Sequence, residues 1–317
     1  MRSPQHQRTL GFIACGLAGA FWSCGFFFGK IALAEMNVGA MILYRFSFAA
    51  LALSPLLFTH RARFTRREWG ALLTCALLGI PLQFLVQFSG LARTTVSHAS
   101  LMVGTAPVLV AVAATIFAHE RMDLTGWIAL CVSTVGAAMI ALGARHPGEL
   151  RHTESHIAAQ ISSPTLTGDL LVVLSLVIAM GWILLNKYLV QRHSAVTVTA
   201  WVTISGTLML AVCVPFLYGI PPVAHVSPRV WVATAASGLL CTASTTLLWN
   251  WGIQKVPVSQ AGVLLNLEPL LGSILGIFLL GDSLGPSALI GGAMIVAAAI
   301  AITTRSRTRV REQLPST

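Results

Sequence analysis

Long apolar runs separated by short polar stretches follow one another along the whole chain. Ten such runs can be marked. A helix satisfies its own backbone hydrogen bonds and needs about 20 residues to cross roughly 30 Å of hydrocarbon, so each run predicts a membrane-spanning helix. The predicted spans are 10–34, 38–58, 69–90, 95–117, 124–143, 167–189, 196–219, 230–250, 257–280 and 284–304.

Composition agrees with this pattern. The chain of 317 residues is 56% hydrophobic and 9% charged, whereas a soluble domain carries about 25% charged residues. The net charge of +10 does not indicate nucleic-acid binding, because the basic residues are scattered between apolar segments and form no stripe. The six cysteines all fall inside apolar runs without metal-site spacing, and we interpret them as small apolar packing residues.

The distribution of Lys and Arg predicts the orientation. With the N-terminus in the cytoplasm, 14 basic residues fall on the cytoplasmic side and five on the opposite side. Clusters at 61–67 and 305–311 account for much of the difference. The positive-inside rule therefore predicts that both termini are cytoplasmic.

An internal repeat relates the two halves of the chain. A shift of 162 positions lays 66–107 over 228–269 without a gap, and it aligns identical Trp, Gly, Ser and Pro residues. A shift of 157 lays 25–33 over 182–190 and aligns Lys30 with Lys187, which we interpret as anchors at helix ends. Each half thus repeats one pattern of five predicted helices.

Five is an odd number, so consecutive repeats must enter the membrane from opposite sides. The predicted fold class is an all-α integral membrane protein with ten transmembrane helices arranged as two inverted-topology five-helix repeats. The predicted parts are a first repeat at 10–143, a polar extracytoplasmic linker at 144–166, a second repeat at 167–304 and a basic cytoplasmic tail at 305–317. Inverted repeats are typical of secondary transporters, whose binding sites lie near the membrane midplane.

Several motifs resemble a known family. They are "FWSCGFFFGK" (21–30), "ILYRFSFAALAL" (42–53), "TTVSHASLMVGTAPVLVAVAATIFAHERM" (94–122) and "VPVSQAGVLLNLEPLLGSILGIFLLGDSL" (256–284). With these motifs the chain resembles EamA-type transporters of the drug/metabolite transporter superfamily. His119 and Asp282 depart from the family's usual Gly and Glu. The resemblance implies a small-molecule carrier, often an exporter of amino acids, in a bacterial inner membrane.

Two charged residues lie inside predicted spans. Glu268 stands in "NLEPL", and a carboxylate there costs roughly 3 kcal/mol unless it meets water, a cation or a proton. Proton coupling, binding of a substrate amine and a structural pairing all remain open for it. Arg45 could extend to the membrane surface, pair with Glu268 or bind a substrate carboxylate. Pro107 and Pro269 could bend their helices.

A polar stripe recurs at matched positions of the two repeats. Gln83 and Gln87 share one face of their helix, and their repeat partners are Thr245 and Trp249, followed by Asn250. Together with Arg45 these residues are the candidate substrate-binding set. Hydrogen bonding between helices is the alternative interpretation.

No enzyme motif occurs in the chain. It has no glycine-rich phosphate loop and no HExxH or GxSxG sequence, and we expect neither a cofactor nor a metal. The predicted function is a secondary transporter, an exporter of small metabolites that works by alternating access. The expected partners are a small-molecule substrate and the bilayer. A membrane-embedded enzyme acting on a lipid-linked substrate and a small-solute channel are the alternatives.

Overall fold

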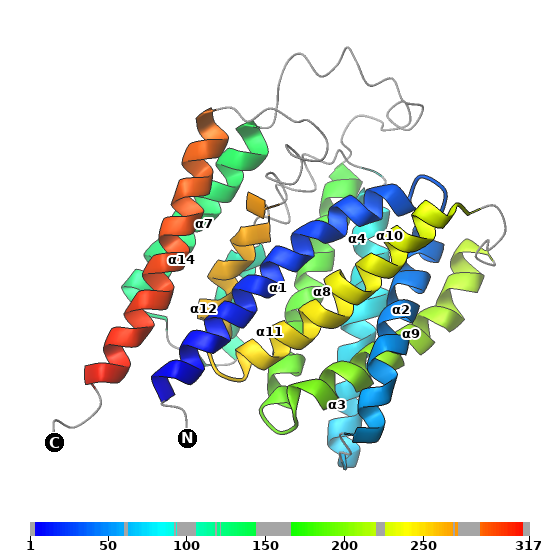
Figure 1. The fold of residues 1–317 in the computed structure, drawn as a ribbon, viewed down its shortest axis with the longest axis horizontal. Helices are drawn as coiled ribbons and strands as arrows, with labels where there is room; N and C mark the ends of the chain where they lie inside the picture. The colour runs from blue at the N-terminus through cyan, green and yellow to red at the C-terminus, as the bar shows by residue number, and fades with distance from the viewer. Residues whose placement is uncertain are drawn as a thin grey trace.

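The computed structural model describes residues 4–59, 63–91, 93, 106–117, 119–120, 122–143, 166–219, 226–268, 270–271 and 286–312. Within these ranges every regular element is a helix, and the helices form one bundle (Figure 1). Pro269, Asp282 and most of the predicted linker lie outside the described residues.

The helices fall into two series along the chain. The first series is α1 (Pro4–Ala32), α2 (Val38–Thr59), α3 (Arg66–Leu77), the π-helical turn η1 (Leu78–Leu82), α4 (Gln83–Leu91), α6 (Ala106–Phe117) and α7 (Leu124–Gly143). The second is α8 (Leu166–Val190), α9 (Ala195–Tyr218), α10 (Pro228–Gly238), the π-helical turn η4 (Leu239–Ser244), α11 (Thr245–Ile253), α12 (Val258–Val263), the 3₁₀ turn η5 (Leu264–Asn266) and α14 (Pro286–Glu312).

Six helical stretches in the described ranges are long and apolar enough to cross a membrane. They are Gln5–Gly29, Val38–Leu57, Arg66–Gly90, Leu166–Val190, Ala195–Tyr218 and Pro228–Ile253. Shorter apolar helices occur at Ala106–Phe117, Leu124–Met139 and Leu289–Ile302. Large apolar side chains such as Phe216 and Leu124 stay exposed on the outside of the bundle, as expected for a surface that faces lipid. The prediction of an all-α membrane protein is confirmed.

The helix bounds follow the two shifts found in the sequence. A shift of 162 carries the start of α3 to the start of α10, and it carries both ends of α4 to the two ends of α11. The same shift carries Leu124, where α7 begins, to Pro286, where α14 begins. A shift of 157 carries Val38 to Ala195, the first residues of α2 and α9.

Matched helices run in opposite directions in Figure 1. The helix α1 rises from its blue end, whereas α8 descends; α3 and α4 rise, whereas α10 and α11 descend. The first residues of α1 and the last residues of α14 lie at the same end of the molecule, the lower end of the view.

Helix packing has the same regularity. The helix α4 packs against α8, and its counterpart α11 packs against α1. Three matched pairs contact each other directly, namely α2 with α9, α6 with α12 and α7 with α14. A Cβ on Gly252 would collide with Gly11 and Cys15 of α1, and a Cβ on Gly90 would collide with Gly168 of α8. Because shifts of 162 and 157 relate these glycines, both close helix contacts rest on equivalent positions.

Local signals set several helix ends that the hydrophobic pattern left imprecise. The Thr65 side chain accepts a hydrogen bond from the Glu68 backbone N–H while the Glu68 carboxylate accepts one from the Thr65 N–H, so α3 begins at Arg66 and not at 69. Ser227 caps α10 at the matched position. Pro107 lies in the first turn of α6, where its missing N–H costs no helical hydrogen bond.

Candidate functional site

The Arg45 side chain lies inside the bundle and does not extend to the membrane surface. It is 6% exposed, which excludes the first of the three alternatives, an extension to the membrane surface. Its Nε donates to Thr242 Oγ1 at 2.8 Å, and one terminal nitrogen donates to the Cys241 carbonyl at 3.2 Å. Arg45 of α2 is therefore held by η4, in the second half of the chain.

The π-helical turn creates this position. In such a turn the backbone is wider than in an α-helix, so carbonyl groups lose their usual partners. Thr242 Oγ1 donates to the Ser237 carbonyl at 3.2 Å, and Thr245 Oγ1 donates to the Leu240 carbonyl at 2.7 Å. The same Thr242 oxygen accepts from Arg45 Nε, which links the guanidinium to the widened turn.

Space for the guanidinium comes from Gly25 of α1. A Cβ built at Gly25 would lie 3.7 Å from a terminal nitrogen of Arg45 and 3.4 Å from the Cβ of Cys241. At the matched place in the other half, Trp182 of α8 packs directly over Gly79 of η1. The residue that corresponds to Arg45 there is Val202. One half of the molecule thus holds a cation where the other half is filled by a tryptophan.

Aromatic rings line the guanidinium. The Arg45 Cζ lies 5.4 Å from the Phe84 ring centroid and 5.9 Å from that of Phe46, both within cation–π range. Trp22 and Trp249 form a second aromatic pair between α1 and α11, with ring centroids 5.6 Å apart.

Glu268 lies two residues after the 3₁₀ turn η5, where the helical path that begins with α12 is irregular. Its side chain is partly buried. The Glu268 carboxylate interacts electrostatically with Arg45, yet the described atoms of these two residues form no direct salt bridge. Arg45 and Glu268 thus come from the two halves of the chain and are not joined by an ion pair in the described structure.

The predicted polar stripe divides into two groups. Gln83 and Gln87 of α4 are partly buried, whereas Thr245, Trp249 and Asn250 are almost completely buried. Thr245 and Asn250 use their hydrogen bonds on protein groups. In the described part of the chain, Gln83 Oε1 and Trp249 Nε1 are buried without a hydrogen-bond partner. Such groups are costly unless a ligand or water meets them.

Sequence reasoning did not identify the groups that hold Arg45. Thr242 is one of many threonines in apolar segments, and no sequence signal marks a π-helical turn that lacks a proline. It also missed Asn186, an amide in the apolar run "WILLNKYLV" whose position beside Lys187 was a usable signal. The described residues contain no group of three or more side chains suited to a metal ion.

Comparisons with known proteins agree on one family. The model of the EamA-like transporter family matches residues 9–142 and 166–304. An uncharacterized transporter of Archaeoglobus fulgidus is 25% identical over 287 residues, covering 89% of this chain and 93% of its own length. A probable terminal-alkyne amino-acid exporter of Streptantibioticus cattleyicolor is 25% identical over 296 residues, 92% of each chain.

Two further similarities extend over nearly the whole chain. The inner membrane protein YtfF of Escherichia coli is 23% identical over 320 aligned positions, covering 94% of this chain and 95% of its own. One protein of known crystal structure superimposes with a TM-score of 0.76 over 94% of this chain and 98% of that one. At 18% identity this last likeness concerns the fold alone.

Proposed function

The chain belongs to the EamA-like transporter family, and from that premise we propose that it is a secondary carrier that exports small amphiphilic metabolites such as amino acids. The family consists of transporters, which excludes the alternative of a membrane-embedded enzyme. The relative from Streptantibioticus cattleyicolor, named as a probable amino-acid exporter, supports the substrate class.

The proposed architecture is ten transmembrane helices in two inverted five-helix repeats, at 10–143 and 167–304, joined by the polar linker 144–166. Three observations support it: the helix bounds repeat at constant shifts, matched helices run in opposite directions, and matched helices make equivalent contacts. This is the arrangement in which one repeat can rock against the other around a central site.

The observation that carries the proposal is the buried Arg45 guanidinium. It is held by a hydroxyl and a carbonyl of η4, and it forms no salt bridge among the described residues. Glu268, from the second half of the chain, is the acidic group that acts on it electrostatically. Buried charges in membrane helices are rare and mark substrate or ion pathways. Arg45 is the proposed ligand of a substrate carboxylate. Glu268 is the proposed proton-coupling residue.

The remaining substrate contacts belong to the polar stripe. Gln83 and Trp249 offer an unpaired acceptor and an unpaired donor, and Gln87 lies one turn from Gln83. Thr245 and Asn250 continue the stripe along α11 and position it through their hydrogen bonds. The six residues would surround a solute at the midplane during alternating access.

The proposed location is a bacterial inner membrane, with both termini and the basic tail 305–317 in the cytoplasm. The excess of basic residues on that side supports the orientation. The first residues of α1 and the last of α14 lie at one end of the bundle, as this orientation requires.

A thermal-shift screen of the purified protein tests the substrate site. We expect an amino acid to raise the melting temperature, because a ligand that binds only the folded state stabilises it. Arg45→Gln should abolish that rise. Arg192→Gln should preserve it, since Arg192 is exposed and lies over the Tyr188 ring. Equal ligand shifts in both variants would exclude Arg45 as a substrate contact.

A further inference from the structure

Helices α8 and α11 hold each other's ends. Lys187 Nζ of α8 donates to the carbonyls of Ile253 and Val256, at and beyond the end of α11; the second contact is 3.1 Å. In return Gln254 Nε2, just after α11, donates to the carbonyls of Val190 at 2.5 Å and His193 at 3.0 Å, at and beyond the end of α8. Carbonyls at a helix C-terminus lack intrahelical partners, so these contacts satisfy groups that would otherwise need water.

One turn further inside, a chain of side chains joins three helices. Asn186 Nδ2 of α8 donates to Asn250 Oδ1 of α11, and Asn250 Nδ2 donates to Thr199 Oγ1 of α9 at 2.7 Å. All three residues are 1% exposed or less. Each hydrogen bond therefore acts where water does not compete.

The start of α12 is held at the same end of the molecule. Glu120, which follows α6, accepts hydrogen bonds from the backbone N–H groups of Val258 at 3.0 Å and Ser259 at 2.8 Å. The segment between α11 and α12 is thus fixed on one side by Lys187 and on the other by Glu120.

The opposite end of the molecule has no equivalent polar chain at the matched positions. The shifts of 157 and 162 place Gly29, Ile42 and Phe88 where Asn186, Thr199 and Asn250 stand. The Asn186–Asn250–Thr199 chain therefore has no counterpart at these three matched positions, whereas Lys187 is matched by Lys30.

We propose that Asn186, Lys187, Thr199, Asn250 and Gln254 form a polar gate, closed in this structure, at the end where α1 begins and α14 ends. The gate opens as a unit when the carrier turns toward that side. This inference rests on the proposed carrier function. Bonds between polar side chains can be exchanged for bonds to water at small net cost. A polar gate can therefore open to an aqueous phase at a smaller cost than an apolar contact of the same size.

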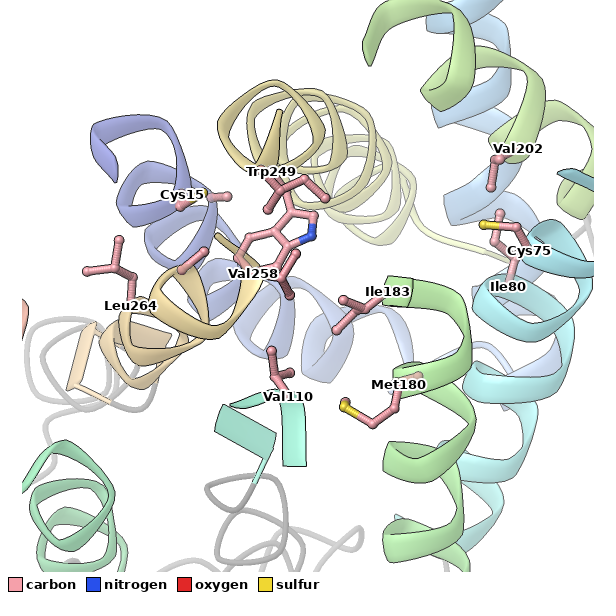
Figure 2. Close-up of a cluster of buried hydrophobic side chains, with 14 of the residues drawn as sticks. Cys15, Cys75, Ile80, Val110, Met180, Ile183, Val202, Trp249, Val258 and Leu264 are labelled. Carbon is pink, nitrogen blue, oxygen red and sulfur yellow. The ribbon is translucent and has the colours of Figure 1, made fainter. Parts of the chain in front are cut away.

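A native cysteine reports on the gate. Cys15 of α1 is fully buried and lies against Gly252 in the last turn of α11, beside the carbonyls that Lys187 binds. Figure 2 shows Cys15 next to Trp249, between α1 and α11. Its thiol can react with a water-borne reagent only when these helices separate.

The test measures alkylation of Cys15 in the full chain with the other five cysteines replaced by alanine. A membrane-impermeant maleimide is applied to the cytoplasmic side in inside-out vesicles and to the opposite side in right-side-out vesicles. Thr199→Val removes the acceptor of Asn250 while keeping the side-chain shape. Losing one hydrogen bond of ordinary strength should raise the labelling rate roughly five-fold, and only from the cytoplasmic side.

Thr207→Val is the matched control. Thr207 is a buried threonine on the same helix, two turns away, and it donates to the Phe46 and Thr203 carbonyls outside the gate. It should label at the parent rate. Gln254→Leu removes the hydrogen bonds from Gln254 to the Val190 and His193 carbonyls. It should accelerate labelling as Thr199→Val does, and it tests the gate if Thr199→Val does not fold.

Unchanged labelling in the gate variants, or equal acceleration in Thr207→Val, would overturn the gate. Solute exchange measured on the same parent protein tests the carrier function separately. A parent that exchanges no solute while its gate variants label faster would contradict the carrier and retain the gate.

Discussion

Arg45 and Glu268 are the two residues on which the proposed transport chemistry rests. Arg45 keeps its charge in a buried place because Thr242, the Cys241 carbonyl and two aromatic rings replace its hydration. Glu268 receives no such set of partners among the described residues, and Arg45 is the cation that acts on it electrostatically. A carboxyl in that situation is suited to gaining and losing a proton during a cycle.

Glu268→Gln tests this role, because glutamine keeps the shape of a protonated carboxyl. Gradient-driven uptake into proteoliposomes should be lost, while exchange of solute at zero gradient should persist. Glu35→Gln is the control, since Glu35 lies in the turn after α1, outside the spans, and should leave both activities intact. Normal gradient-driven transport by Glu268→Gln at every pH would exclude proton coupling through this residue.

At the residue scale, the sequence reveals which charges are unusual but not what surrounds them. A lone Glu and a lone Arg in apolar runs can be found by inspection. The partners of Arg45 come from a widened turn nearly 200 positions away, and no local pattern predicts that contact. Asn250 hydrogen-bonds with Asn186 and Thr199 of neighbouring helices, and its place in the substrate-binding set stays a proposal.

At the scale of elements, helix ends carry much of the specificity. His119 follows α6 and has a φ of 52°, in the left-handed region that favours glycine. This conformation accounts for the glycine that the resemblance to EamA-type transporters implies at this position. The chain then turns so that Glu120 reaches the first residues of α12.

His119→Gly should therefore stabilise the protein by about 1 kcal/mol, because glycine adopts this conformation without the Cβ penalty. The reverse change, from glycine to a residue with a Cβ, can be made at Gly219. This glycine ends α9 with a φ of 78° and has open space around it. Gly219→Ala should destabilise the protein by about 1–3 kcal/mol. Thermal unfolding in detergent measures both, and a loss of stability in His119→Gly would contradict this account.

A second helix end predicts a pH dependence. The Glu35 carboxylate accepts hydrogen bonds from the Ser227 backbone N–H at 2.6 Å and from Ser227 Oγ at 2.8 Å, and these bonds hold the pKa of Glu35 below its usual 4.5. A lowered folded-state pKa contributes stability that is present above the unfolded-state value and is lost as pH falls through the folded-state value.

At neutral pH, the amides in the first turn of α10 should therefore exchange more slowly in the parent protein than in Glu35→Gln. The exchange rates of the two proteins should converge as pH falls below about 4.5. The exchange is followed by mass spectrometry at matched intrinsic rates. A constant difference down to pH 3 would rule out this linkage.

The helices were predictable from the length and periodicity of the apolar runs. Their local irregularities, which depend on backbone hydrogen bonding, were less predictable. The approximate spans and the two shifts could be found from the sequence because apolar runs and aligned Trp and Gly residues are visible there. The π-helical turns η1 and η4 were not predicted. They interrupt two helices at matched places, and in η4 the interruption is stabilised by threonine hydroxyls.

For the whole molecule, the two halves have equivalent helices but different side chains at several matched positions. Arg45 and Gly25 stand where Val202 and Trp182 stand in the other half, and the polar gate stands opposite Gly29, Ile42 and Phe88. In the proposed carrier, equivalent backbones would let the halves exchange conformations. Different side chains would make the two end states unequal in free energy and so in population.

The proposed orientation has a direct test. A tag at Thr317 should be protected from protease in intact spheroplasts, and a cysteine placed at Ser155 should react there with an impermeant maleimide. Both follow from cytoplasmic termini and an odd number of spans in each repeat. A C-terminal tag that is cleaved from outside would contradict the inverted arrangement.

The central claim is that this protein carries a solute across the membrane through one alternating site, and counterflow measures that most directly. Proteoliposomes are loaded with unlabelled amino acid, chosen by the thermal-shift screen, and are diluted into a trace of labelled solute without any ion gradient. A carrier should accumulate label transiently above its equilibrium level, saturably, and Arg45→Gln should not. Label that enters in proportion to concentration and is indifferent to the solute inside would indicate a channel and contradict the account.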